Sequence, residues 1–351
     1  MFVTSLSCIS PQKTSDESFF KGEIVTHSGN RYQAIEPSYS TLIPAGLLRR
    51  MGKAVRMGVG AGLPLINESQ DLGAIILGTA NGGLEDCLKF LNQIVDYEEG
   101  TLTPTNFVQS TPNAVAGNLA LMSKNTGYNT THVHKGLAFE CALLDALLLL
   151  GEGKVKTLLL GSIEEISDYN YNIDLLAGSF KSEHTTSETL LSSGSTGAVC
   201  GEGAAMFVLE SENSGNALAQ IVDVDQISNP DQAELGARLK HFLQKNELTT
   251  NDIDVLILGF SGDNRNDHWY SQMHQEFFLH STVYSYKNLV GDYPTASSFA
   301  AWLAVQVLTG KQLPDQLLVS NAFNLSKPKN VLIYNHYQGV QHGWILLSAL
   351  T

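Results

Sequence analysis

Two helical segments without a polar face are the features that most constrain how this chain folds. Residues 137–150 and 296–309 are apolar on nearly every side. A helix at a protein surface normally shows its apolar residues on one stripe only. Each segment also follows a strand-like run and a polar turn. Because helices of this composition need cover on all sides, we expect a layered protein in which both lie between sheets.

Short apolar runs alternate with helical patterns along the whole chain. Alternation of this kind indicates an α/β fold, and the repeated strand–turn–buried-helix unit indicates an internal duplication. A polar stretch rich in Ser and Gly precedes residue 215, so we expect two halves, 1–215 and 216–351. Strands are expected at 2–9, 72–78, 131–134, 157–161, 204–209, 220–224, 255–259, 282–286, 331–334 and 344–347, and further helices at 45–60, 84–94 and 114–123.

Composition excludes several functional classes. The 351 residues carry 21 Lys+Arg against 35 Asp+Glu, a net charge of −14, whereas nucleic-acid binding needs an excess of cations. No apolar run is long enough to span a bilayer, and the N-terminal segment lacks a signal-peptide pattern. The four cysteines form no CxxC pair, which predicts neither disulfides nor zinc. We expect a cytoplasmic protein with no metal and no cofactor. With only 16% charged residues, part of its surface is expected to be covered by another subunit.

Residues 201–210 read GEGAAMFVLE and closely resemble the GEGAGxxVLE signature of β-ketoacyl synthases. Three more segments are similar to that family in the same order: GTANGG at 78–83, PNAVAG at 112–117 and DALLLLGEGKVKTLLLGSIE at 145–164. The resemblance covers most of the chain. It implies a thiolase-like α/β fold, with two similar halves in a layered α-β-α-β-α arrangement and buried central helices. It also implies work on acyl groups carried by an acyl carrier protein.

The resemblance also identifies the catalytic positions, and they are altered. In the family a cysteine at the start of a buried helix accepts the acyl chain, where the helix N-terminus lowers the thiol pKa. The ungapped register of 145–164 places that nucleophile at Gly136. Cys141, five residues later, falls on another side of the helix and is expected in the core. The resemblance therefore implies that the nucleophile is absent.

The two catalytic histidines, which stabilise an enolate in the family, are missing as well. The family's KxxxGH segment matches Lys287 to Asp292, with the lysine kept and the histidine replaced. The strand end that should carry the other histidine continues to Ser261 without one. The loop at 335–343 also departs from the family's GFGG. Glu164 matches a retained glutamate, for which we expect a structural role.

Four cations, Arg49, Arg50, Lys53 and Arg56, lie within eight residues of this acidic chain. Since acyl carrier proteins are acidic, this group is a candidate docking patch, and a solvated helix face is an equally good reading.

Further candidates lie near a subunit interface in family dimers. Phe107 and Gln109 precede the PN segment and could shape the end of an acyl tunnel, although core packing is somewhat favoured. His132 and His134 are expected on one face of a strand. With no third metal ligand identified, an interface or structural role is favoured over a metal site.

Three functions are compatible with these observations. The first is a non-catalytic subunit, resembling a chain length factor, that forms a heterodimer with an active ketosynthase. Such pairs occur in type II polyketide, aryl polyene and flexirubin-like pathways. The second is an active acyltransferase with altered catalytic residues, for which a homodimer is expected. The third is a scaffold that binds an acyl carrier protein through the Arg49–Arg56 patch.

Overall fold

The structure is a computed structural model that describes residues 1–69, 71–321 and 327–350. Its described part contains one large sheet and a small two-stranded one, β2 (Arg31–Tyr32) with β6 (Cys200–Gly201). The spatial order of the large sheet is β11 (Leu318–Ser320), β10 (Thr282–Ser285), β9 (Val255–Leu258), β12 (Asn330–Tyr337), β13 (Gln341–Ser348), β8 (Ala219–Ser228), β1 (Phe2–Ile9), β7 (Gly203–Glu210), β5 (Thr157–Glu164), β3 (Ala74–Gly78) and β4 (Tyr128–His132).

This strand order contains the same arrangement twice. The order β4-β3-β5-β7-β1 in the first half corresponds to β10-β9-β12-β13-β8 in the second. In each set the four strand pairs, taken in this order, are parallel, parallel, antiparallel and antiparallel. The two sets meet where β1 pairs with β8, over only two residues. The expected duplication is therefore present.

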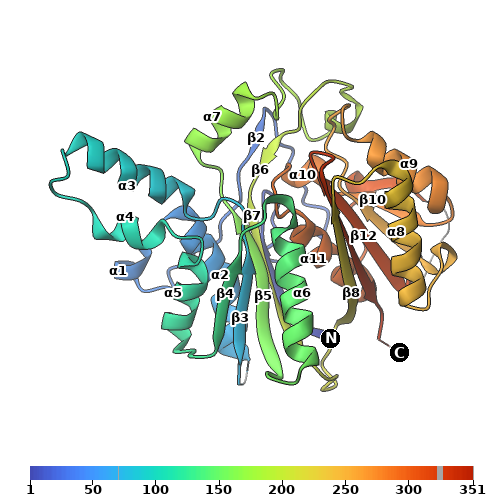
Figure 1. The fold of residues 1–351 in the computed structure, drawn as a ribbon, viewed down its shortest axis with the longest axis horizontal. Coiled ribbons are helices and arrows are strands. Elements are labelled where there is room, and N and C mark those ends of the chain that lie inside the picture. The colour runs from blue at the N-terminus through green and yellow to red at the C-terminus, as the bar shows by residue number, and fades with distance from the viewer. Residues whose placement is uncertain (70, 322–326, 351) are drawn as a thin grey trace.

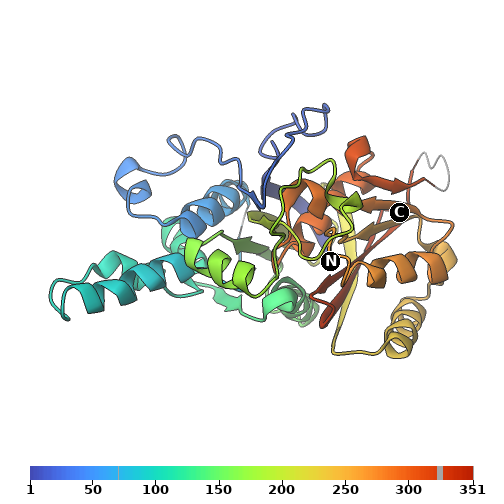
Figure 2. The same cartoon turned by 90° about the horizontal axis from the view of Figure 1, so that it is seen from above.

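The helices occupy matching places in the two halves (Figure 1). The central pair is α6 (Ala138–Gly151) and α11 (Ser297–Leu308). The outer helices of the first half are α2 (Lys53–Glu68) and α5 (Ala114–Ser123). Those of the second half are α8 (Gln232–Lys245) and α9 (His268–Phe277). Short helices α1 (Ala45–Leu48) and α10 (Lys287–Val290), the helix α7 (Asp168–Leu176), and an arm made of α3 (Leu84–Asp96) and α4 (Pro104–Gln109) complete the fold. The arm projects from the body in both views (Figures 1 and 2).

Alternation along the strands explains the layers. On β3, Ile76 packs toward α6 and α11 in the central core, whereas its neighbours Ile75 and Leu77 pack toward α2 and α5. On β9, Ile257 belongs to the central core and Leu258 to the outer core with α8 and α9. Successive side chains of a strand point to opposite faces, so two sheet faces enclose the central helices. This is the expected α-β-α-β-α layering of a thiolase-like fold.

The two central helices differ in how completely they are covered. In α11, eleven of twelve residues are buried. In α6, Leu144 and Leu148 remain 39% and 58% exposed. The expectation of cover on all sides therefore holds for α11 within the single chain, and α6 keeps one open apolar face.

Two local expectations need correction. The helix expected at 45–60 is interrupted: α1 ends at Leu48 and α2 begins at Lys53, because the Gln109 side-chain amide bonds the intervening backbone at Arg50 O and Gly52 N. The strand expected at 131–134 instead runs from Tyr128 to His132. His134 therefore lies beyond the strand, at the start of a 3₁₀ turn, and the two histidines do not share a strand face. Among the described residues no helix is long and apolar enough to cross a membrane.

The GEGA segment joins the two halves through a contact between two backbones. A Cβ on Gly201 would lie 2.1 Å from Val290 O, and one on Gly291 would lie 2.6 Å from Gly201 Cα. Gly291 also has a φ of +76°, a conformation that favours glycine. The contact is sealed by backbone hydrogen bonds from Asp292 N to Val199 O and from Gly201 N to Asp292 O, at 2.6 and 3.0 Å. Both glycines are thus required sterically, and their contact sets the position of Asp292.

The other GEGA residue with a structural task is Glu202, which is fully buried. Its carboxylate accepts hydrogen bonds from Ala34 N and Ile166 N, both at 2.8 Å, and pairs with Lys53 Nζ. A buried carboxylate is stable only when its oxygens are satisfied in this way. Glu202 therefore ties three segments of the first half together.

Replacing Gly291 by alanine is expected to lower the free energy of unfolding by more than about 3 kcal/mol, since the methyl group would meet the Gly201 backbone in a strained conformation. Gly117→Ala is the matched control. Gly117 lies inside α5 with nothing within 4 Å of an added Cβ, so a gain of about 0.5–1 kcal/mol is expected. Urea unfolding measures both, and a Gly291→Ala protein as stable as the parent would contradict the contact.

Candidate functional site

Gly136 has no space for a side chain. It is buried in the 3₁₀ turn Lys135–Leu137 that leads into α6. A Cβ built on Gly136 would lie 2.0 Å from Cβ and 2.6 Å from Cγ of Tyr337. Its amide donates to Gln341 Oε1 at 3.0 Å. Tyr337 and Gln341 belong to the β12–β13 hairpin, so this hairpin fills the place in front of the helix where a side chain at 136 would project.

Lys287 and Asp292 form a buried ion pair behind this hairpin. Lys287 Nζ lies 2.8 Å from Asp292 Oδ1, and the lysine side chain is only 2% exposed. A buried charge is tolerated when it is paired, so the carboxylate of Asp292 compensates the charge of the buried Lys287. Lys287 begins α10 and Asp292 follows Gly291, which means that the glycine contact described above holds this pair in place.

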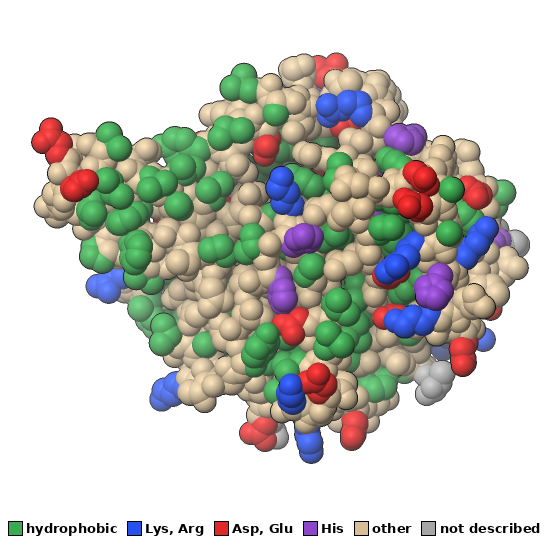
Figure 3. Space-filling model, viewed as in Figure 1, with side chains coloured by type: hydrophobic (Ala, Val, Ile, Leu, Met, Phe, Trp, Pro, Cys, Tyr) green, Lys and Arg blue, Asp and Glu red, His purple; other side chains and the backbone are tan. Residues whose placement is uncertain are grey.

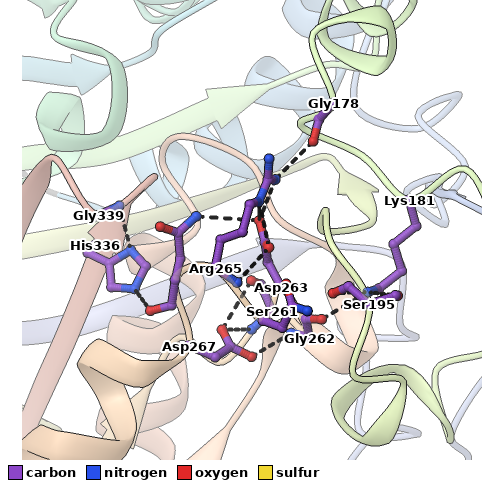
Figure 4. Close-up of polar contacts among 12 residues, drawn as sticks. Gly178, Lys181, Ser195, Ser261, Gly262, Asp263, Arg265, Asp267, His336 and Gly339 are labelled. Atoms are coloured by element: carbon purple, nitrogen blue, oxygen red, sulfur yellow. Dashed lines mark hydrogen bonds and ion pairs between the residues drawn. The ribbon is translucent and has the colours of Figure 1, made fainter.

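The turn after β9 is held by its own carboxylates (Figure 4). Asp267 accepts hydrogen bonds from the amides of Ser261 and Gly262, at 3.0 and 2.8 Å. Asp263 receives Arg265 Nη2 at 2.6 Å, and the same guanidinium nitrogen donates to Gly178 O at 2.9 Å. We call this the stapled turn, because these hydrogen bonds hold it in place. Ser261 is one of its structural residues, and its hydroxyl lies 3.3 Å from Asp267 Oδ1.

A second group of hydrogen bonds, donated by Lys181, joins this turn to the loop after α7. Lys181 is fully buried, and its Nζ donates to Ser195 Oγ at 2.7 Å and to Gly262 O at 2.8 Å (Figure 4). Burial lowers the pKa of Lys181. Together with Arg265, this lysine fixes the loop from the first half onto the turn from the second half.

His336, on β12, is the histidine nearest to these groups, and both of its ring nitrogens are occupied. Nδ1 accepts from Gly339 N at 3.2 Å, and Nε2 lies 3.1 Å from Asn266 O (Figure 4). The ring also stacks on Tyr270, with centroids 4.2 Å apart. Burial, followed by the charge of Lys287, holds its pKa well below the ordinary value. His336 is thus a neutral structural residue. The hydrogen bond that it accepts from the Gly339 amide holds the β12–β13 hairpin turn against the ring.

Three buried glutamates surround the same region. Glu164 accepts hydrogen bonds from Thr79 Oγ1, Ala80 N and Asn81 N, which fixes the turn after β3. Glu165 accepts one from Ala54 N at the start of α2. Glu140 lies one turn into α6, and its Oε2 has no hydrogen-bond partner among the described residues. Burial raises the pKa of each of the three to about 7.

A cavity of about 360 Å³ lies among these elements. Its wall includes Lys287 and Asp292, the stapled turn, α7 and the hairpin residue Tyr337. None of the residues in its wall comes from α6 or from the 3₁₀ turn before it. The cavity thus stops short of Gly136. No group of three or more His, Cys, Asp or Glu side chains with metal-binding geometry occurs in the part of the chain that is described.

The family model for the β-ketoacyl synthase N-terminal domain matches residues 26–235. The chain belongs to the β-ketoacyl synthase family. Among solved structures it is similar to a β-ketoacyl synthase from Burkholderia phymatum STM815, with a TM-score of 0.79, 17% identity and coverage of 100% of this chain and 99% of the other. No curated protein matches the sequence.

Two further similar structures contain ketosynthase pairs. One is the ishigamide ketosynthase/chain length factor, with a TM-score of 0.79, 15% identity and coverage of 100% and 99% of the two chains. The other is a ketosynthase in complex with its chain length factor from Xenorhabdus doucetiae, with a TM-score of 0.76, 16% identity and coverage of 99% and 98%. At these identities the likeness establishes the thiolase-like ketosynthase fold over the full chain.

The structure brings only some of the predicted site residues together. Lys287, Asp292, Ser261 and Glu164 all lie in the cavity wall, and Gly136 lies behind Tyr337. The candidate docking patch does not form one free surface: Lys53 pairs with Glu202, and Arg56 pairs with Glu36 through two hydrogen bonds of 2.8 and 2.7 Å. Arg49 and Arg50 are exposed and form no ion pair with any described residue.

The residues predicted to lie at an interface or a tunnel end also lie in different environments. Phe107 is 58% exposed on the arm and packs against Phe90, whereas Gln109 is buried and holds the α1–α2 link. His132 Nε2 lies within hydrogen-bond distance of Asp145 Oδ2 of α6, at 2.9 Å, and His134 is exposed. The residue that sequence reasoning missed is Tyr337. Its only signal was the departure of the 335–343 loop from the family pattern.

Gly136→Cys is expected to produce no acyl thioester and to lower the free energy of unfolding by about 2 kcal/mol or more, because the new side chain overlaps Tyr337. Intact-mass analysis after incubation with an acyl carrier protein loaded with an acyl group tests the first effect. Adding Tyr337→Gly, which removes the overlapping atoms, should recover part of the stability. An acyl adduct on the single variant would contradict this geometry.

Stability is expected to fall as the pH rises from about 4.5 to about 7. Burial raises the pKa of Glu140 in the folded chain to about 7 from its ordinary value of 4.5, so the folded state binds more protons and loses that advantage as the pH rises. Glu164 and Glu165 act in the same direction. In Glu140→Gln the slope of unfolding free energy against pH should be shallower. Glu276→Gln, at an exposed site, should keep the parent slope, and equal slopes in all three proteins would refute the assignment.

Proposed function

We propose that this chain is the non-catalytic partner, of the chain-length-factor type, of an active ketosynthase. The pathway would be one of fatty acid or polyketide synthesis, of the aryl polyene or flexirubin-like kind. The observation that carries the proposal is the filled space at Gly136. Loss of a cysteine alone would leave room for other chemistry, whereas here the Tyr337 side chain occupies the position itself.

The residues at the family's catalytic positions are engaged with neighbouring groups of this chain. Asp292 is paired with Lys287, the stapled turn stands where the first histidine is expected, and the Gly339 amide is used by His336. A group that is already bonded within the protein is a poor donor or base for a substrate. These replacements favour a subunit without its own condensation chemistry over an acyltransferase with altered residues.

The second support is an apolar face that the single chain leaves open. We define it by Tyr128 and Val133, at either end of β4, and by Leu144 and Leu148 of α6, all between 39% and 58% exposed. Figure 3 shows hydrophobic side chains over α6 and over the α3–α4 arm on this side of the molecule. Contiguous exposed apolar surface marks a site of protein association.

The backbone at this face favours pairing with another strand. β4 is the last strand of the sheet, so one row of its N–H and C=O groups has no neighbour. Exposed edges of this kind template the addition of a strand from another chain. A partner ketosynthase that continues the sheet through β4 would cover the apolar face at the same time. Among similar structures, the ketosynthase and chain length factor of X. doucetiae are in complex with each other.

A scaffold that binds an acyl carrier protein through the Arg49–Arg56 patch has less support. Two of its four cations are committed to Glu202 and Glu36, and the chain as a whole carries a net charge of −14. Steering toward an acidic carrier needs positive potential. We therefore assign carrier-protein docking to the assembled pair, to which Arg49 and Arg50 of this chain can contribute.

Co-expression with a cysteine-containing ketosynthase encoded nearby tests the proposal. The two chains are expected to co-purify, and acyl label should appear only on the ketosynthase. Leu148→Glu should weaken the pair at least tenfold, since it places a charge in the covered face. Leu279→Glu is the control, because Leu279 is 68% exposed in the link between α9 and β10. A stable homodimer that ignores the ketosynthase would refute the proposal.

A further inference from the structure

The cavity left at the degenerate site has the charge pattern of a cation site. Its wall contains five carboxylates against two cations: Glu164, Glu165, Asp174, Asp263 and Asp292 against Arg265 and Lys287. Lys287 and Arg265 are each already committed to an acid of the same wall. Of the three remaining carboxylates, Glu164 and Glu165 have a pKa raised to about 7 by burial and carry only part of their charge. Asp174 forms no ion pair with a described residue, so it contributes most of the net negative charge of the cavity.

Asp174 is the least compensated of these acids. It lies on α7, and no side-chain hydrogen bond or ion pair joins it to any described residue. Burial raises its pKa, while Lys135 opposes that shift from outside the cavity wall. A carboxylate in a half-buried position without a partner is unfavourable. A ligand that brings a positive charge would relieve it.

Two neutral groups of the wall, Tyr337 and Cys200, lie close to both Asp292 and Asp174. The phenol of Tyr337 and the thiol of Cys200 both have a raised pKa, through burial first and then through nearby acids that include both Asp292 and Asp174. The two aspartates thus act on one shared volume, although they come from different halves of the chain. A charge placed there interacts with both.

Two buried polar atoms of the wall also lack partners. Glu165 and Tyr171 are 7% and 4% exposed, and neither Glu165 Oε1 nor the Tyr171 hydroxyl has a hydrogen-bond partner among the described residues, although the Arg31 guanidinium lies over the Tyr171 ring. Both can accept a hydrogen bond. An unsatisfied buried acceptor costs free energy of folding, and a ligand that donates N–H groups supplies what is missing.

The remaining wall is aromatic, with Phe180, Tyr293 and Tyr337. Aromatic surface suits the apolar part of a small organic molecule and attracts a cation to its faces. The hydrogen bonds from Lys181 to Gly262 O and from Arg265 to Gly178 O hold the two sides of the cavity in fixed positions, so the site is preformed. Preorganisation of this kind lowers the entropic cost of binding.

We propose that this cavity binds a small organic amine, with its ammonium group between Asp174 and Asp292 and its apolar part against the aromatic wall. The site is thereby reversed in charge relative to one that handles an anionic substrate, because Asp292 stands where the family has a histidine. This inference goes beyond pairing with a ketosynthase and does not depend on it.

Three probes of similar shape and different charge test the site in the full chain alone: 2-phenylethylamine, phenylacetate and 2-phenylethanol. The amine is expected to raise the melting temperature progressively with its concentration and to give a saturable heat of binding by calorimetry. The anion should give neither, and the neutral alcohol should bind at least tenfold more weakly than the amine. Equal or tighter binding of phenylacetate or 2-phenylethanol would overturn the proposal, as would the absence of amine binding.

Variants locate the binding. Asp174→Asn keeps both ion pairs of the wall intact and should weaken amine binding about tenfold or more, the scale of a charged hydrogen bond. Asp292→Asn should weaken it as well. Glu276→Gln, outside the cavity, should leave it unchanged. Amine binding that survives both aspartate variants lies elsewhere and refutes the site, whereas co-purification with a ketosynthase is measured separately and is unaffected by that result.

Discussion

The contact between Gly201 and Gly291 is the constraint on which the arrangement of this site depends. It brings the GEGA segment of the first half against the α10 turn of the second, closely enough that neither position accepts a Cβ. Everything that faces the cavity from α10 onward, including Lys287 and Asp292, takes its position from this contact. The glycines are therefore needed to join two similar halves, and this need is independent of whether the protein catalyses a reaction.

That independence explains why a signature segment can persist while reactive side chains are lost. Glu202, Glu164 and Glu165 satisfy backbone amides in three different segments, and removing any of them would leave buried donors without partners. Under the proposed function, the residues that stand at the catalytic positions of this chain have a structural task instead, as the Lys287–Asp292 pair and the Asp267 turn illustrate.

Much of the fold could be predicted from the sequence, because the burial of 296–309 on all sides and the repeated strand pattern follow directly from apolar composition. The resemblance also located Gly136, Asp292 and Ser261 at the altered site. What could not be predicted were interactions between distant segments. The neutralisation of Lys53 by Glu202 joins residues 149 positions apart, and the overlap of Tyr337 with position 136 depends on where a hairpin lies in space. Strand ends were also uncertain, so His134 was placed on a strand that ends at His132.

Tyr337 has a consequence for the history of such a chain. With its ring against Gly136, a reversion to cysteine is penalised before it can be useful, and a second change on the hairpin is required to make it tolerable. Under the proposed function, two histidines would also have to replace residues that are engaged in an ion pair and a hydrogen-bonded turn. A return to catalysis would therefore need several changes, each of which is expected to lower stability when made alone.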